Sequence, residues 1–325
     1  MKFHTLFRYK TSRLLSLLSI SLALGTYCYP SLGHTFDNSA PPQIQGGDKL
    51  IWADEFDHPL DLTTLEKLAS WTSTDFWQDA NIGYMDPGGG SWQINPNQHP
   101  FYSPFKIANG VLTITARKTP SAIVPDIEAV VGAGNAPKWS GGMLITNKDL
   151  RSFKYGYFEV RARWPNPGNG MFPGIWLFVA DGRGLSRASG AEIDILEIMG
   201  YGQGRPWSTT LHLRDWLGGG DQVDVASVDY DTTNWHIYGL DWQPSYLRFY
   251  YDGVMIGEVT GEDASWFDVP MSIRLNFAMD GRYVKKFSDE TTPEVMRMEV
   301  DYLRVYENTS SIARPKNILV VHPAF

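Results

Sequence analysis

The sequence predicts an all-β fold of the sandwich type, and three observations lead to this prediction. Short apolar runs recur from Leu50 onward and are separated by glycine, proline, asparagine and aspartate. Hydrophobic residues make up 43% of the 325-residue chain and aromatic residues 14%, which suits pleated strands around a sizeable core. Few stretches carry the 3.6-residue apolar period of a long helix. We therefore expect one β-sandwich domain over residues 49–307.

Two hairpins are the most specific local features. An Asn-Gly pair lies within the alternating residues 105–117, and an Asp-Gly pair joins residues 246–251 to residues 254–259. Both pairs favour tight two-residue turns. Further strands are expected at residues 156–164, 235–242, 271–279 and 298–306. Three segments are expected to be loops that build the binding surface: residues 71–104, 119–140 and 181–190.

The N-terminus has the pattern of a secretory signal peptide. Four basic residues precede the apolar residues 14–27, which are too few to span a bilayer comfortably. We predict a signal peptide over residues 1–33, a linker over residues 34–48 and a C-terminal tail over residues 308–325. An uncleaved anchor is the alternative. Cys28 is the only cysteine, so the mature chain would hold no disulfide or cysteine-ligated metal, in a secreted or periplasmic location.

The charge balance excludes one class of partner. The formal net charge is −8, which argues against nucleic-acid binding because phosphates need a basic surface. No stretch after the signal segment is apolar enough to cross a membrane, and we expect a monomer. Four arginines flank the acidic strand described below, and they either balance its carboxylates or contact an acidic glycan: Arg183, Arg187, Arg205 and Arg214.

Residues 191–200 are the most informative segment. As a helix, their apolar side chains would surround the axis instead of forming a stripe. As a strand, Glu192 and Asp194 share one face, but strict alternation places Glu197 on the apolar face. A β-bulge near residues 195–196 returns Glu197 to the acidic face. We therefore predict a bulged strand with three carboxylates on one side.

Three crowded carboxylates favour a catalytic role. Mutual repulsion pushes at least one of them to hold a proton near neutral pH. A retaining glycosidase needs this arrangement, since one carboxylate attacks the sugar and a protonated partner donates to the leaving oxygen. Two alternatives remain open from the residues alone: a solvated strand face and a site for Ca²⁺ or Mg²⁺.

The acidic motif resembles the signature of glycoside hydrolase family 16, in the bulged form of its laminarinases. It runs Glu-Ile-Asp-Ile-Leu-Glu over residues 192–197. Other stretches resemble family strands in the expected order, from residue 50 to residue 307: residues 52–56, 109–114, 155–162 and 298–306. The resemblance implies a concanavalin A-like jelly-roll β-sandwich with a concave substrate cleft.

The resemblance also implies roles for particular residues. Glu192 matches the family's nucleophile, Asp194 its assisting residue and Glu197 its acid/base in a retaining, endo-acting reaction that needs no cofactor. Trp176 matches a cleft tryptophan, and His212 matches a histidine that contacts the acidic cluster or the sugar. Core packing is the alternative for both.

Some features lie outside the shared pattern. Residues 172–174 read Phe-Pro-Gly where laminarinases often show Trp-Pro-Ala, and the loop at residues 88–93 also differs. Trp92 in this loop is expected either to stack on sugar or to pack in the core. Family members often carry a structural Ca²⁺, for which Glu55 and Asp301 are candidate ligands.

A β-linked polysaccharide is therefore the expected partner, with β-1,3- or β-1,3-1,4-glucan first. A depolymerase for a succinoglycan-like bacterial exopolysaccharide is the nearest alternative. A non-catalytic glycan-binding protein on the same fold is the other, although all three acids are present.

Overall fold

The computed structural model describes residues 49–60, 62, 71–73, 83–85, 90–147, 150–180, 190–199, 207–214, 220–228, 231–279 and 292–307. These residues belong to a compact unit, Pro42–Phe325. The predicted signal peptide (1–33), linker (34–48) and tail (308–325), and the predicted loop over residues 181–189, lie outside the described residues. Within the described residues, the helices are too short or too polar to cross a membrane.

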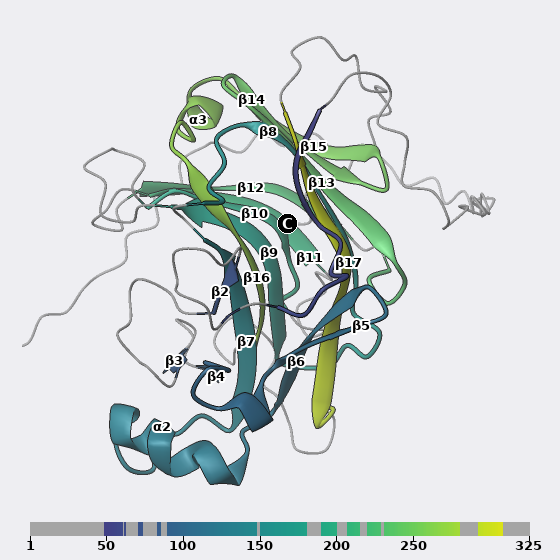
Figure 1. Cartoon of the computed structure of the whole chain (residues 1–325). Helices are drawn as coiled ribbons and strands as arrows, with labels where there is room; N and C mark the ends of the chain where they lie inside the picture. The colour runs from purple at the N-terminus through teal and green to yellow at the C-terminus, as the bar shows by residue number, and fades with distance from the viewer. Residues whose placement is uncertain are drawn as a thin grey trace, which may run out of the picture. The chain divides into compact units, whose positions relative to one another are not determined.

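The first sheet is antiparallel and has a long closing strand at its centre. Its strands follow one another as β5 (Phe105–Ala108), β6 (Val111–Lys118), β17 (Val295–Tyr306), β8 (Gly156–Arg163), β13 (His236–Gln243), β14 (Tyr246–Tyr251) and β15 (Val254–Thr260). The second half of β17 also pairs with β1 (Leu50–Asp54). This order places the N-terminal and C-terminal strands of the unit side by side (Figure 1).

The second sheet carries the predicted acidic strand at an inner position. Its strands follow one another as β2 (Trp71–Thr72), β7 (Trp139–Thr146), β16 (Met271–Met279), β9 (Met171–Val179), β10 (Glu192–Glu197), β11 (Trp207–Arg214) and β12 (Gly220–Val228). The start of β7 pairs with β6 and with β4 (Ser91–Ile94), which in turn pairs with β3 (Gly83–Met85). Thus β7 joins the two sheets.

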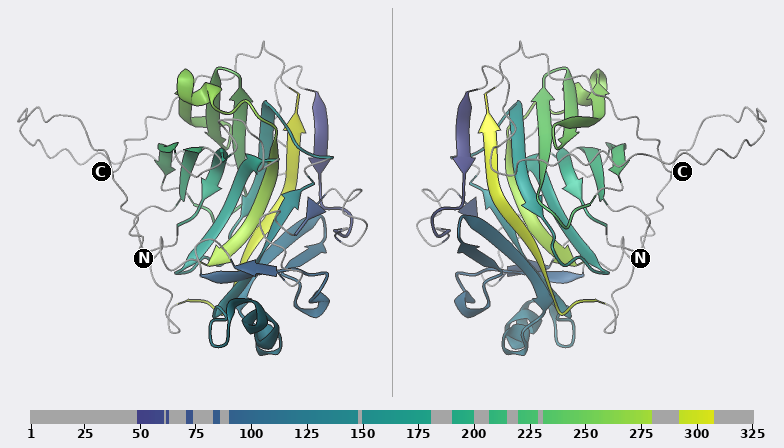
Figure 2. Two further views of the ribbon diagram at one scale, coloured as in Figure 1. Left: turned by 90° about the vertical axis from the view of Figure 1, so that its left-hand side faces the viewer. Right: turned by 90° about the vertical axis from the view of Figure 1, so that its right-hand side faces the viewer.

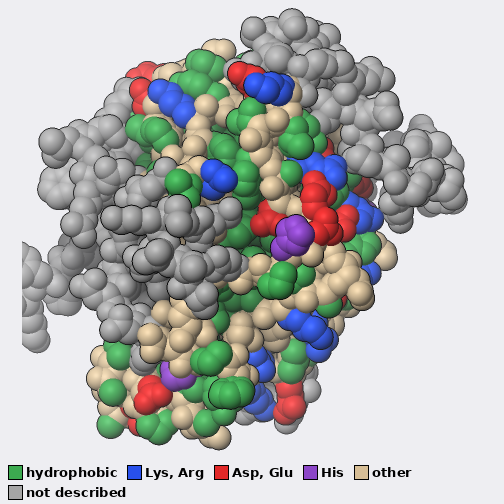
Figure 3. Space-filling model, viewed as in Figure 1, with side chains coloured by type: hydrophobic (Ala, Val, Ile, Leu, Met, Phe, Trp, Pro, Cys, Tyr) green, Lys and Arg blue, Asp and Glu red, His purple; other side chains and the backbone are tan. Residues whose placement is uncertain are grey.

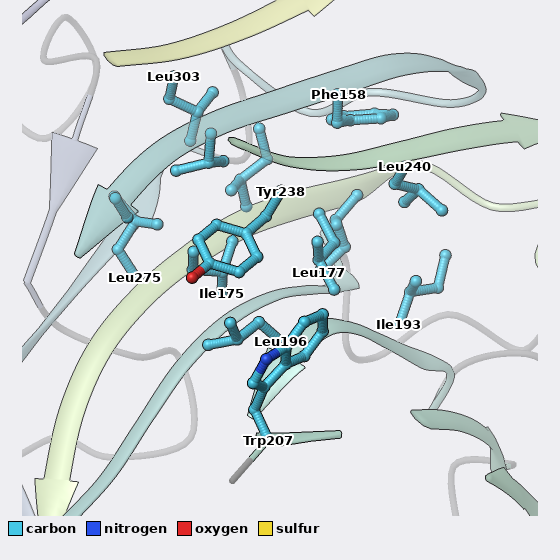
Figure 4. Packing of buried hydrophobic residues seen from close by; sticks show 14 of the residues in the cluster. Phe158, Ile175, Leu177, Ile193, Leu196, Trp207, Tyr238, Leu240, Leu275 and Leu303 are labelled. Atoms are coloured by element: carbon cyan, nitrogen blue, oxygen red, sulfur yellow. The ribbon is translucent and has the colours of Figure 1, made fainter. Parts of the chain in front are cut away.

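The core lies between the two sheets, as Figure 4 shows for part of it. Alternate residues of β9 and β10 point into it, among them Leu177 and Ile193, and they meet Phe158, Leu240 and Leu303 from the first sheet. Each such side chain contributes about 1.5–3 kcal/mol by leaving water. The side views of Figure 2 show the strands of the two sheets layered against each other. The predicted all-β sandwich is confirmed.

The two predicted hairpins have the expected turns. Asn109 and Gly110 have φ of 54° and 71°, and Asp252 and Gly253 have φ of 47° and 77°. Positive φ at both central residues defines a type I′ turn, which matches the twist of the strands it joins. The further strands expected from the sequence are also present, with β17 beginning three residues earlier than predicted, at Val295 instead of residue 298.

The segment over residues 119–140 is more ordered than predicted. It contains η2 (Ser121–Ile123) and the helix α2 (Val124–Val131), where a loop was expected. Pro125 lies in the first turn and Gly132 follows the last residue with φ of 93°, both common at helix ends. In the described region, η1 (Pro100–Tyr102) and α3 (Glu262–Ser265) are further short helices. α2 lies beyond the ends of β4 and β7 (Figures 1 and 2).

Candidate active site

The predicted bulge is present in β10 and lies between Asp194 and Glu197. Against β9, Asp194 pairs with Trp176, whereas Leu196 pairs with the very next residue, Ile175. One extra residue of β10 is therefore inserted at this point. Thr209 Oγ1 of β11 donates a hydrogen bond to the Ile195 carbonyl oxygen at 3.0 Å. This bond gives the Ile195 carbonyl oxygen a partner at the point where the bulge interrupts the ladder.

The pairing register places all three carboxylates on one face. On β11, Glu192, Asp194 and Glu197 lie opposite residues 212, 210 and 208, and on β9 they lie opposite residues 178, 176 and 174. All of these partners are even-numbered, so their side chains share one side of the sheet. Ile193, Ile195 and Leu196 belong to the core on the other side. Figure 3 shows the types of side chain on the face of the molecule that is seen in Figure 1.

Arg214 links two members of this group. Its Nη1 lies 3.3 Å from Glu192 Oε2, and its Nη2 lies 2.6 Å from His212 Nδ1. His212 Nε2 lies 3.1 Å from Asp194 Oδ2. The last contact is close but poorly aligned, since Asp194 Oδ2 has no hydrogen-bond partner in the described part of the chain. The four side chains therefore form a ring of contacts with one weakly aligned member.

Burial sets the protonation of the carboxylates. Asp194 is 1% exposed, and this burial, with the neighbouring charge of Glu192, raises its pKa well above the ordinary value. Burial also raises the pKa of Glu197 well above its ordinary value, and the charges of Asp194 and Glu192 add to the rise. Glu192 instead faces the guanidinium of Arg214 and accepts a hydrogen bond from Asp194. Charged and protonated carboxyl groups thus lie side by side.

His212 is neutral in this setting. Its burial lowers the pKa of the imidazole, and the positive charge of Arg214 lowers it further, whereas the charges of Glu192 and Asp224 act in the opposite direction. Loss of hydration disfavours the charged ring more than the nearby carboxylates favour it. The histidine therefore takes part as a hydrogen-bonding group instead of as a cation.

An aromatic surface borders the carboxylates on the β9 side. Trp176 is half-buried, and its Nε1 donates a hydrogen bond to Asn276 Oδ1 of β16 at 2.8 Å. The guanidinium carbon of Arg274 lies 4.7 Å from the ring centroids of both Trp176 and Phe178. These contacts fix the indole next to Asp194, its partner in the register.

The glycine of the Phe-Pro-Gly stretch leaves room for this arrangement. A Cβ atom at Gly174 would lie 2.9 Å from Asn276 Oδ1 and 3.1 Å from Trp176 Cδ1. Gly174 also pairs with Glu197 in the ladder. An alanine at this position would therefore press on the Trp176–Asn276 hydrogen bond directly beside the third carboxylate.

The structure corrects the sugar-stacking expectation for Trp92. Its side chain is 1% exposed and packs with Ile94, Ile123 and Ile127. Ile123 and Ile127 come from η2 and α2, the segment that was expected to be a loop. Trp92 therefore fills a small hydrophobic cluster, the second of the two roles expected for it.

Each of the two predicted calcium ligands is paired with an arginine. Glu55 accepts two hydrogen bonds from Arg304 at 2.7 and 2.9 Å, and Asp301 accepts one from Arg161 at 2.6 Å. Ca²⁺ takes six to eight oxygen ligands, and here a guanidinium already neutralises each carboxylate. A calcium ion at these residues would have to displace the arginines, and calcium binding there stays a prediction.

One group in the described residues has the spacing of a metal site. The ligand atoms of Glu192, Asp194 and His212 lie within 4.8 Å of one another. However, Glu192 and the Nδ1 of His212 already accept hydrogen bonds from Arg214. A cation would have to compete with a guanidinium here, so the arrangement suits proton and sugar chemistry better.

Comparison with known proteins agrees with this geometry. Residues 102–304, more than half of the chain, match the model of the glycosyl hydrolases family 16. The chain belongs to this family. The endo-1,3-1,4-beta-glycanase ExsH of Rhizobium meliloti is 28% identical to this family 16 chain over 239 residues, which are 73% of the chain and 47% of that protein.

Two further matches extend over most of the length of the known protein. A beta-glucanase of Rhodothermus marinus is 27% identical over 79% of this chain and 85% of that protein. The laminarinase catalytic domain of Thermotoga petrophila matches with a TM-score of 0.58 and 23% identity, over 81% of this chain and 99% of that one. This structural likeness shows the fold. Because the chain spans about half the length of the Rhizobium relative, 47%, the activity of whole relatives enters below only as a proposal.

Sequence reasoning did not find every residue of the site. It gave Arg214 two general roles, balancing carboxylates or contacting an acidic glycan, and it did not single out Asn276 or Arg274. Arg214 had one usable signal, because it lies two residues after His212 and so shares its face of a strand. Arg183, Arg187 and Arg205 lie outside the described residues.

Proposed function

We propose that this family 16 chain is a secreted, endo-acting, retaining hydrolase of β-1,3- or β-1,3-1,4-glucan. One observation carries the proposal: a bulged strand turns Glu192, Asp194 and Glu197 to one face, where burial raises the pKa of the second and third. Retaining hydrolysis uses one charged and one protonated carboxyl group on the same side of the scissile bond. The endo-1,3-1,4-beta-glycanase and the beta-glucanase among the relatives support this proposal.

In the first half of the reaction, the Glu192 carboxylate attacks the anomeric carbon. Glu197 transfers its proton to the glycosidic oxygen, so the leaving sugar departs as a neutral alcohol. The products are a glycosyl ester on Glu192 and a charged Glu197. The raised pKa of Glu197 supports this role, because the acid must hold its proton near neutral pH.

In the second half, Glu197 acts as the base. Its carboxylate takes a proton from a water molecule, whose oxygen attacks the anomeric carbon and releases Glu192. The cycle restores both carboxyl groups and consumes one water per bond. The side chains of the chain itself supply every proton transfer in this scheme.

Asp194 is proposed to assist both halves. In its protonated form it donates a hydrogen bond to Glu192, which prevents two adjacent negative charges in a buried place. Trp176 is proposed to present its indole to a sugar ring, since exposed aromatic faces suit the C–H surfaces of sugars and its orientation is fixed by Asn276. The enzyme is proposed to work as a monomer.

A substrate panel tests this proposal. The purified chain is incubated with laminarin, lichenan, agarose, carrageenan, xyloglucan and succinoglycan, and the products are sized over time. We expect a range of oligosaccharides early in the digestion of laminarin or lichenan, which is the pattern of internal cleavage. Cleavage of succinoglycan alone would favour an exopolysaccharide depolymerase. If Glu192→Gln and Glu197→Gln variants cut at the wild-type rate, the site is wrongly assigned.

A further inference from the structure

Arg214 is held at a fixed place by the backbone around it. Its carbonyl oxygen accepts a hydrogen bond from the Gly190 N–H at 3.1 Å, which ties the end of β11 to the start of β10. On its other side Arg214 pairs with Gly220, where a Cβ atom would lie 1.8 Å from the Leu213 carbonyl oxygen. Only glycine permits that approach, so the main chain of Arg214 is fixed from both neighbouring strands.

The side chain of Arg214 faces the carboxylates for a simple reason of register. His212 pairs directly with Glu192, and Arg214 lies two residues further on the same face of β11. Diagonal neighbours on adjacent strands are within reach of a long side chain. The planar guanidinium can therefore point one nitrogen at Glu192 and another at His212, as the distances of 3.3 and 2.6 Å record.

The contact with His212 determines where the imidazole carries its proton. A guanidinium has only N–H donors and no acceptor. His212 Nδ1 must therefore accept the hydrogen bond from Arg214, which leaves the proton of the neutral ring on Nε2. Nε2 is the nitrogen that lies 3.1 Å from Asp194 Oδ2, so the ring presents a donor to Asp194.

We propose that Arg214 is a positioning residue that gives the active-site hydrogen bonds one direction. Arg214 donates to His212 Nδ1, the His212 Nε2–H faces Asp194, the Asp194 hydroxyl donates to Glu192, and Arg214 also donates to Glu192. Every donor in this ring leads toward the carboxylate proposed to attack the sugar. The effect of Arg214 on catalysis rests on the proposed function, whereas the predicted tautomer of His212 does not.

The opposite tautomer would work against the reaction. A ring protonated on Nδ1 could not accept from Arg214, and its bare Nε2 would face the Asp194 carboxyl group. That nitrogen would compete with Glu192 for the Asp194 proton. Two adjacent carboxylates would then share one buried place without a proton between them, which Coulomb repulsion opposes.

The inference is tested by the protonation of His212 itself. Long-range ¹H–¹⁵N NMR spectra of the chain labelled with ¹⁵N-histidine report which ring nitrogen carries the proton, and a His212→Gln variant assigns the signal among the seven histidines. In the wild-type chain near neutral pH, we expect Nδ1 to be unprotonated and Nε2 protonated. A wild-type ring with its proton on Nδ1 would overturn the proposal, whether or not any glycan is cut.

Three arginine variants extend the test. Arg214→Met should shift His212 toward a mixture of tautomers and raise its apparent pKa, because a nearby cation is lost. Arg214→Lys keeps a charged donor but not the planar fork that reaches Glu192 and His212 together, so the tautomer shift should be smaller than in Arg214→Met. Arg248→Met is the matched control, since Arg248 has a similar exposure, pairs with Glu258 at 2.7 Å and lies on β14 of the other sheet. A His212 spectrum that is unchanged in Arg214→Met would contradict the proposal.

Kinetics connect the tautomer to the reaction. On the best substrate of the panel, Arg214→Met should lower kcat about tenfold to hundredfold with a smaller change in KM. In a His212→Gln background the same substitution should cost less, because part of its effect passes through the ring. The pH profile is read with the titratable and charged groups around His212 in view: Glu192, Asp194 and Glu197 on β10, Arg214 on β11 and Asp224 on β12. Equal losses in both backgrounds would show that Arg214 does not act through His212.

Discussion

Two strips of acidic side chains on this fold meet their arginines in different ways. On the first sheet, Asp301 and Glu299 of β17 each face an arginine of their own from β8, Arg161 and Arg163, at 2.6 Å. On the second sheet, the three carboxylates of β10 have Arg214 as their cationic neighbour, 3.3 Å from Glu192. Both strips lie on paired antiparallel strands, so the number of arginines and the degree of burial distinguish them.

The comparison shows how one fold makes ordinary ion pairs in one place and reactive carboxyl groups in another. Partly exposed pairs with matched charges contribute little to stability, about 0–1 kcal/mol each. Carboxyl groups that outnumber their cations in a buried place hold protons instead, as the raised pKa values of Asp194 and Glu197 indicate. A held proton is what general acid catalysis requires.

The largest expected effect separates the two strips by activity. Glu192→Gln should lower kcat about 10⁴-fold or more, because it removes the nucleophile and hence the covalent route. Glu299→Gln, the matched change on β17, should leave kcat unchanged. Release of reducing ends from laminarin or lichenan measures both. Loss of activity in Glu299→Gln of the same size would mean that the substitutions act through the fold instead of the site.

The pH dependence of activity should follow the raised pKa of Glu197. The acid form is active, so kcat/KM should fall as the pH rises through this raised pKa, by about tenfold per pH unit beyond it. The fall should therefore begin well above 4.5, the ordinary value for a glutamate. A profile of kcat/KM against pH measures this limb. Loss of activity already near the ordinary value would contradict the protonated state assigned to Glu197.

Removal of Trp176 should weaken binding more than chemistry. Trp176→Ala should raise KM about tenfold and change kcat less, because a stacking surface holds ground state and transition state alike. Trp235→Ala is the matched control, because Trp235 directly precedes β13 of the first sheet and lies against Arg161 and Arg163 at 4.9 and 4.6 Å. Initial-rate kinetics on oligosaccharides measure both variants. A similar KM increase in the Trp235 variant would speak against a sugar contact at Trp176.

The smallest effect contrasts the stability of the two strips. Burial raises the pKa of folded Asp194, so its contribution to stability is present below the unfolded pKa and is lost as the pH rises through the folded pKa. Asp194→Asn, which mimics the protonated form, should therefore reduce the fall in Tm between about pH 4 and about pH 8.

Asp301→Asn is the control for this measurement, because Asp301 pairs with Arg161 at 2.6 Å. It should lower the free energy of unfolding by about 1 kcal/mol. Thermal unfolding of both variants against pH gives the answer. If Asp194→Asn loses more stability than Asp301→Asn at neutral pH, Asp194 is charged in the folded chain. The contrast between protonated carboxyl groups on β10 and ion-paired carboxylates on β17 would then be wrong.

The sequence was sufficient to predict the bulged strand, because Glu197 conflicts with strict alternation and an inserted residue resolves the conflict. The hairpins were predictable for an equally local reason, their Asn-Gly and Asp-Gly turns. Local patterns did not reveal α2, which has eight residues and only Ile127 buried, so its apolar period is too short to recognise.

Other features depend on contacts between distant parts of the chain. Trp92 meets Ile123 and Ile127 only after the chain has folded, so its burial was one of two open alternatives. The role of Arg214 depends on the pairing of Glu192 with His212, which are twenty positions apart and are brought together by the register of β10 and β11. Strand register over such distances is set by tertiary packing and is not written in either strand alone.

The most direct test of the account is to trap the intermediate. A 2-deoxy-2-fluoro glycoside of a β-1,3-linked glucose disaccharide with a good leaving group slows release of a glycosyl-enzyme, and peptide mass spectrometry then locates the added sugar. We predict a single glycosyl group on Glu192, and its absence in Glu192→Gln. A sugar on Glu197 or on any residue outside β10, or hydrolysis that inverts the anomeric configuration with no covalent species, would contradict the account.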